Sequence, residues 1–151
     1  MTRLGSAFGD PLALRTKTFS LAGQTFKVRV PLTKEVEAAE NRIKDIDPIE
    51  AEKRYEKLVS GFDKTVQTEK LVFTEDDVIF DGRSTRDLVR SNLEFEGRVV
   101  EYFKFLIPIE GTLDDLTYEE IDAEWPLQVQ LDLLAKIAEV ISPSYKDERK
   151  N

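Results

Sequence analysis

The sequence predicts an α+β fold that is mostly α-helical, with one N-terminal β-hairpin packed on a bundle of four to five helices. From about Thr16 to Val30 apolar and polar residues alternate, which is the period of a half-buried strand. From Pro31 the apolar spacing changes to three and four, which is the period of a helix. The chain has 151 residues, 40% of them hydrophobic, enough for one compact core. We therefore expect a flexible N-terminal arm at 1–14, a single globular domain at 15–143 and a charged tail at 144–151.

The arm and the hairpin come first in the chain. Residues 1–14 show no sustained apolar period and include Gly5, Gly9 and Pro11, which favours a mobile or partner-dependent arm. Ala22 and Gly23 then mark the turn of the hairpin. A lone hairpin is marginal in water, so its apolar face is expected to pack on helices or on another subunit. That face would consist of Phe19, Leu21, Phe26, Val28 and Val30.

Two helices are predicted next. The first begins near Thr33 and runs to about Ile46, with a buried stripe at Val36, Ala39 or Glu40, Ile43 and Ile46. The second runs from Pro48 to about Ser60, because Asp47 can cap it, Pro48 suits the first helical position and Glu50 completes a capping box. Gly61 is the expected stop. The buried stripe of this second helix would be Ala51, Tyr55, Leu58, Val59 and Phe62.

The middle of the chain allows two interpretations. The runs 71–73 and 78–80 around Thr74 to Asp77 favour a second short hairpin, with an Asp81-Gly82 turn closing it. A helix starting at Thr74 is the alternative. Ser84 and Asp87 then form a capping box for a helix of about 22 residues that Pro108 stops. Its buried face would be Leu88, Asn92, Phe95, Val99, Phe103 and Leu106.

The end of the chain predicts two further helices. Thr117 and Glu120 form a capping box for the first, and the second begins at Pro126 with Trp125 just outside it. The apolar stripe of the second helix is broad, so it either closes the core or meets another chain. Trp125 suits both roles. The residues that we expect to bind a partner are Trp125, Leu127, Leu131, Leu134, Ile137 and Ile141.

The composition argues against most enzyme chemistry. The chain contains no Cys and no His, which excludes disulfides, thiolate or imidazole metal sites and His-based proton transfer. Eight acidic residues lie between Glu110 and Asp132 without a Lys or Arg, but their spacing matches no calcium loop. Two of these acids, Glu119 and Glu120, already have a structural role at the N-terminus of a predicted helix. We therefore expect no enzyme activity and assign no catalytic, cofactor-binding or metal residue.

The sequence also argues against nucleic acid and membranes as partners. The net charge of −8 repels phosphate backbones, and no run of about 18 apolar residues is present. The segment "FDGRSTRDLV" places Arg83 and Arg86 before a helix, which is compatible with phosphate capture, but an Asp-Gly turn and a serine cap explain every residue in it. Arg90 and Arg98 extend a basic stripe that glutamates interrupt. We expect neither nucleic acid nor membrane as a partner.

Two segments carry a family resemblance. "TFSLAGQTFKVRVPLTKEVE" near the start and "EIDAEWPLQVQLDLLAKIAEVISPSYKD" near the end, separated by a charged helical middle, resemble the tail assembly chaperones and related minor morphogenesis proteins of tailed bacteriophages. The motifs are structural and cover most of the chain loosely. The resemblance implies a non-enzymatic chaperone in the host-cell cytoplasm that binds the tape-measure protein and assists tail-tube polymerisation.

Two alternatives remain beside the chaperone. The first is a structural virion component, such as a head–tail connector, neck or minor tail subunit, that forms a ring. The second is a carboxylate-based metal enzyme. The hairpin edge and the wide final helix predict self-association in either of the two assembly roles, so a homo-oligomer is expected.

Overall fold

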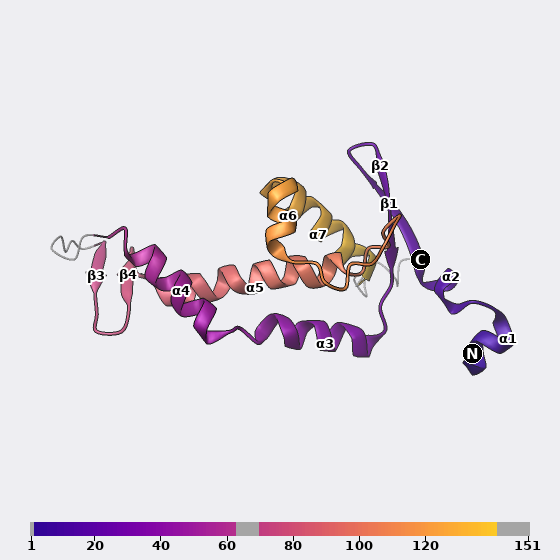
Figure 1. Cartoon of the computed structure of the whole chain (residues 1–151), viewed down its shortest axis with the longest axis horizontal. Coiled ribbons are helices and arrows are strands. Elements are labelled where there is room, and N and C mark those ends of the chain that lie inside the picture. Colours follow the sequence, from indigo (N-terminus) through magenta and orange to yellow (C-terminus); the bar gives the residue numbers. More distant parts are fainter. Residues whose placement is uncertain (1, 63–69, 142–151) are drawn as a thin grey trace, which may run out of the picture. The chain divides into compact units, whose positions relative to one another are not determined.

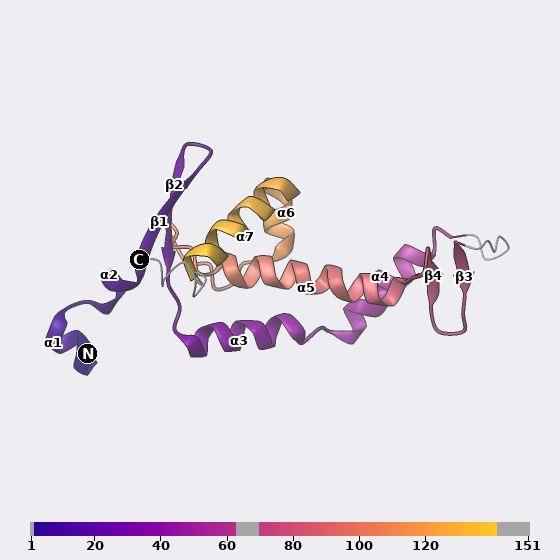
Figure 2. The same cartoon turned by 180° about the vertical axis from the view of Figure 1, so that it is seen from behind.

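The computed structural model describes residues 2–62 and 70–141, and 57% of these residues are helical. The predicted α+β class is confirmed, with a hairpin near the N-terminus and a second one mid-chain (Figures 1 and 2). The tail expected at 144–151 and the end of the expected domain lie outside the described residues. The elements in chain order are α1 (Arg3–Phe8), α2 (Pro11–Arg15), β1 (Thr16–Leu21), β2 (Gln24–Arg29), α3 (Thr33–Lys44), α4 (Pro48–Val59), β3 (Leu71–Phe73), β4 (Val78–Phe80), β5 (Arg83–Ser84), α5 (Thr85–Phe103), α6 (Tyr118–Glu124) and α7 (Leu127–Ile141).

The described residues hold seven helices, two more than the upper bound that we expected. The additional ones are α1 and α2, which occupy most of the expected arm. Thr2 and Asp10 cap them, since each side chain accepts a backbone N–H of the first turn, from Gly5 and Leu12 respectively. Local capping therefore produces short helices where no apolar period is present.

The described chain divides into two compact units. Unit 1 combines residues 1–39 and 98–151, and unit 2 consists of residues 40–97. Helices α3 and α5 each contribute residues to both units. The expectation of one domain over 15–143 stays a prediction.

The hairpin of unit 1 has the predicted strands and turn. Phe19 on β1 is opposite Phe26 on β2, and their rings stack with centroids 5.4 Å apart. Ala22 and Gly23 both have positive φ, 53° and 79°, which is the geometry of a two-residue hairpin turn. Val28 at the centre of the apolar face is fully buried. This face was expected to pack on helices or on another subunit, and at Val28 it is buried by the chain itself.

A third segment pairs with the outer edge of β2. The Arg29 N–H donates to the Phe105 carbonyl at 2.8 Å, and the Ile107 N–H donates to the Lys27 carbonyl at 2.8 Å. Helix α5 is 19 residues long, shorter than the 22 expected, because the chain leaves helical geometry after Phe103 and extends along β2. Residues 105–107 thus cover the outer edge of β2, which would otherwise be open to water.

Ion pairs tie the base of the hairpin to α3. The Glu35 carboxylate accepts hydrogen bonds from Arg15, at 2.7 Å, and from Arg29. It also accepts the Leu32 N–H at 3.1 Å. Burial raises the pKa of Glu35, but these hydrogen bonds and the Arg29 charge outweigh that effect and hold the pKa below its usual 4.5.

Unit 2 packs α4 and the first part of α5 against the short sheet β3-β4-β5. Its core centres on Tyr55, Val78 and Val89. Asp47 caps α4 by accepting the Ile49 N–H at 2.9 Å, with Pro48 in the first turn, as predicted. The partly buried hydrophobic residues around this core are Ala51, Val59, Phe62, Leu71, Phe73 and Leu93.

Several details of unit 2 differ from the sequence-based expectation. The helix alternative at Thr74 is wrong, since residues 71–73 and 78–80 pair as antiparallel strands. The Asp81-Gly82 turn leads from β4 into β5. Leu58 and Leu88 are 43% and 51% exposed, so neither belongs to a buried stripe. On α5 the buried face passes through Val89 and not through Leu88, because Tyr55 and Val78 cover that side.

Candidate functional site

Trp125 lies in the short connection between α6 and α7 in unit 1. The two helices lie side by side in both views (Figures 1 and 2). Thr117 caps α6 as predicted, since its hydroxyl accepts the Glu120 N–H at 3.3 Å. Trp125 ends α6, and its N–H donates to the Ile121 carbonyl at 2.8 Å. Its indole meets the buried Phe103 ring edge to face, with centroids 5.7 Å apart. The tryptophan is therefore anchored while part of its ring remains accessible.

A buried polar side chain fixes the connection between the two helices. Gln130 is fully buried on α7, accepts the Tyr118 hydroxyl at 2.8 Å and donates to the Trp125 carbonyl at 2.9 Å. Its amide also donates to Asp122 at 3.3 Å. The sequence reading missed Gln130, because an apolar period gives no signal for a polar residue at a buried position. The only available signal was its i, i+3, i+7 spacing with Leu133 and Ile137.

Two pockets share Trp125 in their lining, and together we call them the Trp125 groove. One part, about 520 Å³, lies toward the hairpin. The other part, about 240 Å³, lies toward α6, and Leu106, Leu113 and Trp125 line both. A volume of several hundred Å³ is typical of clefts that bind ligands. The remaining lining side chains are Gln24, Thr25, Phe26, Lys27, Ile107, Pro108 and Ile109 in the larger part, and Phe103, Leu116, Glu120, Ile121 and Glu124 in the smaller part.

The charges around the Trp125 groove are unequal at its two parts. Glu120 and Glu124 line the part beside α6, and Lys27 lines the part beside the hairpin. Within residues 2–62 and 70–141, none of these three side chains forms an ion pair or a side-chain hydrogen bond. Their charges are therefore available to a bound molecule.

The six residues expected to bind a partner fall into three groups. Trp125 lines the groove, and Leu127 and Leu131, 55% and 41% exposed, follow one another on the same face of α7. Leu134 and Ile141 are half-buried. Ile137 is fully buried, so its side chain belongs to the core of unit 1 and a partner cannot reach it without unfolding. The buried centre of α7 is Gln130, Leu133 and Ile137.

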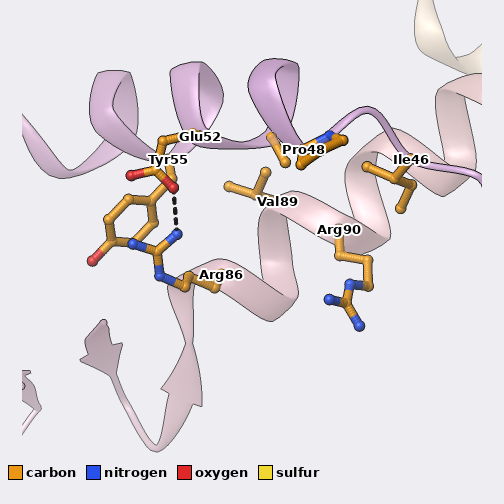
Figure 3. A pocket seen from close by; sticks show the side chains of 8 residues that line it. Ile46, Pro48, Glu52, Tyr55, Arg86, Val89 and Arg90 are labelled. Carbon is orange, nitrogen blue, oxygen red and sulfur yellow. Dashed lines mark hydrogen bonds and ion pairs between the residues drawn. The ribbon is translucent and has the colours of Figure 1, made fainter. Parts of the chain in front are cut away.

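A second, smaller pocket of about 270 Å³ lies in unit 2 (Figure 3). Its main feature is Arg86, whose guanidinium lies 3.8 Å from the centre of the Tyr55 ring and donates to Glu52 at 2.7 Å. Arg90 and Val89 line the same pocket (Figure 3). The charge of Arg86 is thus already compensated inside the protein.

The start of α5 is also occupied, which argues against phosphate capture there. Asp77 accepts the Arg86 N–H at 3.2 Å and the Val78 N–H at 2.7 Å, and it accepts the Ser84 hydroxyl. Burial raises the pKa of Asp77, but these hydrogen bonds and the Arg86 charge outweigh it and keep the pKa below 3.8. Ser84 in turn accepts the Asp87 N–H at 3.2 Å, the predicted cap. A carboxylate therefore takes the place that an anion would use.

Two further observations concern the described residues as a whole. Across 2–62 and 70–141 no group of three or more acidic side chains is placed to hold a metal ion. No helix in the same ranges is both long and apolar enough to cross a membrane.

Comparison with protein-family models, with curated protein sequences and with solved structures finds no significant match to this chain. The resemblance to phage tail assembly proteins therefore rests on the residues of the chain alone.

Proposed function

We propose that this protein is a non-enzymatic assembly chaperone of tailed bacteriophages that holds an apolar segment of the tape-measure protein in the Trp125 groove. By shielding that segment in the host-cell cytoplasm, it assists polymerisation of the tail tube. The observation that carries the proposal is the groove itself, an anchored tryptophan surrounded by accessible apolar side chains. Such a site fits burial of another chain's apolar residues.

The exposed apolar side chains of unit 1 support binding of a protein segment. Ile109 lines the groove and is fully exposed, at 104% of the reference area. Leu127 and Leu131 add accessible apolar area on α7. Exposed apolar surface of this kind is a usual mark of a protein-binding site. The absence of Cys and His from the sequence supports a role without chemistry.

A second role is favoured by the other edge of the hairpin. In the described part of the chain the hairpin forms a two-stranded sheet, and no strand pairs with the outer edge of β1. An open edge can accept a strand from a neighbouring copy. This observation supports a ring-forming virion component, such as a connector or neck subunit, in which the protein stays in the finished particle.

Co-expression with the tape-measure and tail-tube proteins encoded in the same genome tests the chaperone role. We expect the tape-measure protein to copurify with the wild-type chain and not with Ile109→Asp. Because Ile109 is fully exposed, that substitution leaves folding intact. The matched control is Ile49→Asp, since Ile49 is also exposed, at 67%, and belongs to unit 2, whereas the groove lining belongs to unit 1.

Mass spectrometry of purified particles separates the two roles. A chaperone is absent from finished particles, whereas a ring subunit is present in a fixed number per particle. Stoichiometric recovery of this chain from particles would reject the chaperone role. Equal copurification by wild type, Ile109→Asp and Ile49→Asp would show that the Trp125 groove is not the binding site.

A further inference from the structure

We infer that the segment that binds the Trp125 groove is an amphipathic helix of another protein, with basic residues at the end that lies beside Glu120 and Glu124. The inference deepens the proposed function and rests on it, because it specifies the chemistry of the bound segment. Its basis is the combination of an apolar floor, a paired strand edge and an uncompensated pair of carboxylates in one groove.

The backbone pairing at the groove favours a helix over a strand. A strand would bind by adding to the outer edge of β2, yet the Lys27 carbonyl and the Arg29 N–H on that edge already bond to residues 105–107. The groove therefore offers mainly side chains, such as Phe26, Leu106 and Trp125. A helix satisfies its own backbone and presents an apolar stripe to such a surface.

The two carboxylates specify the charge of the bound segment. Glu120 and Glu124 are four residues apart on α6, so they share one face of that helix, and both are exposed. Both line the smaller part of the groove without an ion pair in the described residues. A bound helix with Lys or Arg at this end gains attraction, whereas one with Glu or Asp is repelled.

Lys27 gives the groove a second charged end. It lines the larger part of the groove, on the hairpin side, and is likewise without an ion pair. The charge of the groove lining thus changes from positive on the hairpin side to negative on the α6 side. This arrangement selects the direction in which a helix of unequal charge binds, in addition to selecting its overall sign.

Intrinsic fluorescence measures occupancy of the groove directly, because Trp125 is the single tryptophan in the chain. The probes are two synthetic helical peptides with the same apolar stripe, one with two lysines at one end and one with two glutamates at those positions. A second pair of peptides carries the charged residues at the opposite end. Of the two lysine peptides, we expect the one that binds more tightly to have about tenfold higher affinity than its glutamate counterpart at low salt. This ratio of affinities should fall toward one at high salt.

Matched variants assign this preference to the two carboxylates. Glu120→Gln combined with Glu124→Gln is expected to remove most of the tenfold preference while both peptides still bind. The control combines Glu119→Gln with Glu139→Gln, which removes the same charge at exposed positions outside the groove lining. The control is expected to retain the preference.

The outcomes that would overturn the inference differ from those that test the chaperone role. Equal affinity for lysine and glutamate peptides would reject charge selection and leave the groove as a binding site. No response of Trp125 to any peptide, with the tape-measure protein still copurifying, would place the client elsewhere on the protein. A fluorescence change that depends on protein concentration alone and is lost in Phe8→Asp would identify the occupant as the N-terminal segment of a second copy, since Phe8 is 81% exposed.

Discussion

The guanidinium of Arg54 on α4 binds both carboxylate oxygens of Glu96 on α5 within unit 2. One of the two parallel contacts, from Nη2 to Oε1, is 2.8 Å long. The Arg54 Nε also donates to Glu50 at 3.3 Å. The hydrogen bonds and charge of Glu96 raise the pKa of the Arg54 guanidinium above its usual value. Two-point contact of this kind fixes the helices in direction as well as in distance.

This pair predicts a measurable coupling energy. In a double-mutant cycle with Arg54→Ala and Glu96→Ala, we expect a coupling of about 1 kcal/mol in the free energy of unfolding. The Glu96 side chain is only 15% exposed, which limits screening by water. The comparison pair is Arg86 and Glu52, whose side chains are 40% and 49% exposed, and its coupling should be smaller. Urea denaturation at pH 7 gives both values, and equal couplings would contradict the prediction.

Loss of the buried polar contacts of Gln130 should lower the stability of the fold. Gln130→Leu removes the hydrogen bonds of the Gln130 side chain with the Tyr118 hydroxyl and the Trp125 carbonyl, so we expect a loss of about 1–3 kcal/mol of stability. Gln128→Leu is the control, since Gln128 is exposed on the same helix and bonds only Asp132 among the described residues. Thermal unfolding followed by Trp125 fluorescence compares them. A Gln130→Leu variant as stable as the control would mean that the contacts contribute nothing.

Leu133 and Leu131 test the orientation of α7. Leu133 is fully buried, so Leu133→Ala should destabilise the protein by about 2–5 kcal/mol, through lost transfer energy and the cavity left behind. Leu131 is 41% exposed, so Leu131→Ala should cost less than about 1 kcal/mol. Chemical denaturation curves of both variants give the two losses in the free energy of unfolding. Similar losses at the two positions would show that the helix is rotated from the orientation described.

Glu35 predicts a specific dependence of stability on pH. Its pKa is lower in the folded chain than the 4.5 of the unfolded chain, so its ionised form stabilises the fold above about pH 4.5. That contribution is lost as the pH falls through the folded-state pKa. The stability difference between wild type and Glu35→Gln should therefore be largest near neutral pH and shrink below pH 4.5. Glu37→Gln is the control, since it removes one carboxylate at an exposed position of the same helix.

Elements whose ends are set by local chemistry could be predicted from the sequence. Asp47 with Pro48, Ser84 with Asp87, and Thr117 with Glu120 mark helix starts that the structure confirms, because a cap depends only on residues within one turn. The first hairpin was predictable for the same reason, since two adjacent residues set its turn. Of the six residues predicted to bind a partner, Ile137 is fully buried, and binding by the other five remains a prediction.

The faces of the helices were harder to predict, because they depend on contacts between segments distant in the chain. On α5 the stripe through Leu88 looked as apolar as the one through Val89, and only the packing of Tyr55 and Val78 distinguishes them. Glu96 and Gln130 occupy partly or fully buried positions, although polar side chains such as theirs are usually at the surface. Each is accommodated by a partner that sequence spacing alone does not identify. The Trp125 groove was missed as a whole, since its walls come from β2, residues 106–113 and α6.

The hydrogen bond between the Ile107 N–H and the Lys27 carbonyl joins two parts of the chain that all of unit 2 separates. Unit 2 is continuous in sequence, so during synthesis it can fold before residues 105–107 leave the ribosome. Until then the hairpin lacks the segment that pairs with β2 and exposes the β2 edge to other nascent chains. Closing the unit-1 sheet across a compact insert also costs less chain entropy than closing it across a disordered one. Substitutions that destabilise unit 2 should therefore slow the formation of the groove more than they reduce its stability once it has formed.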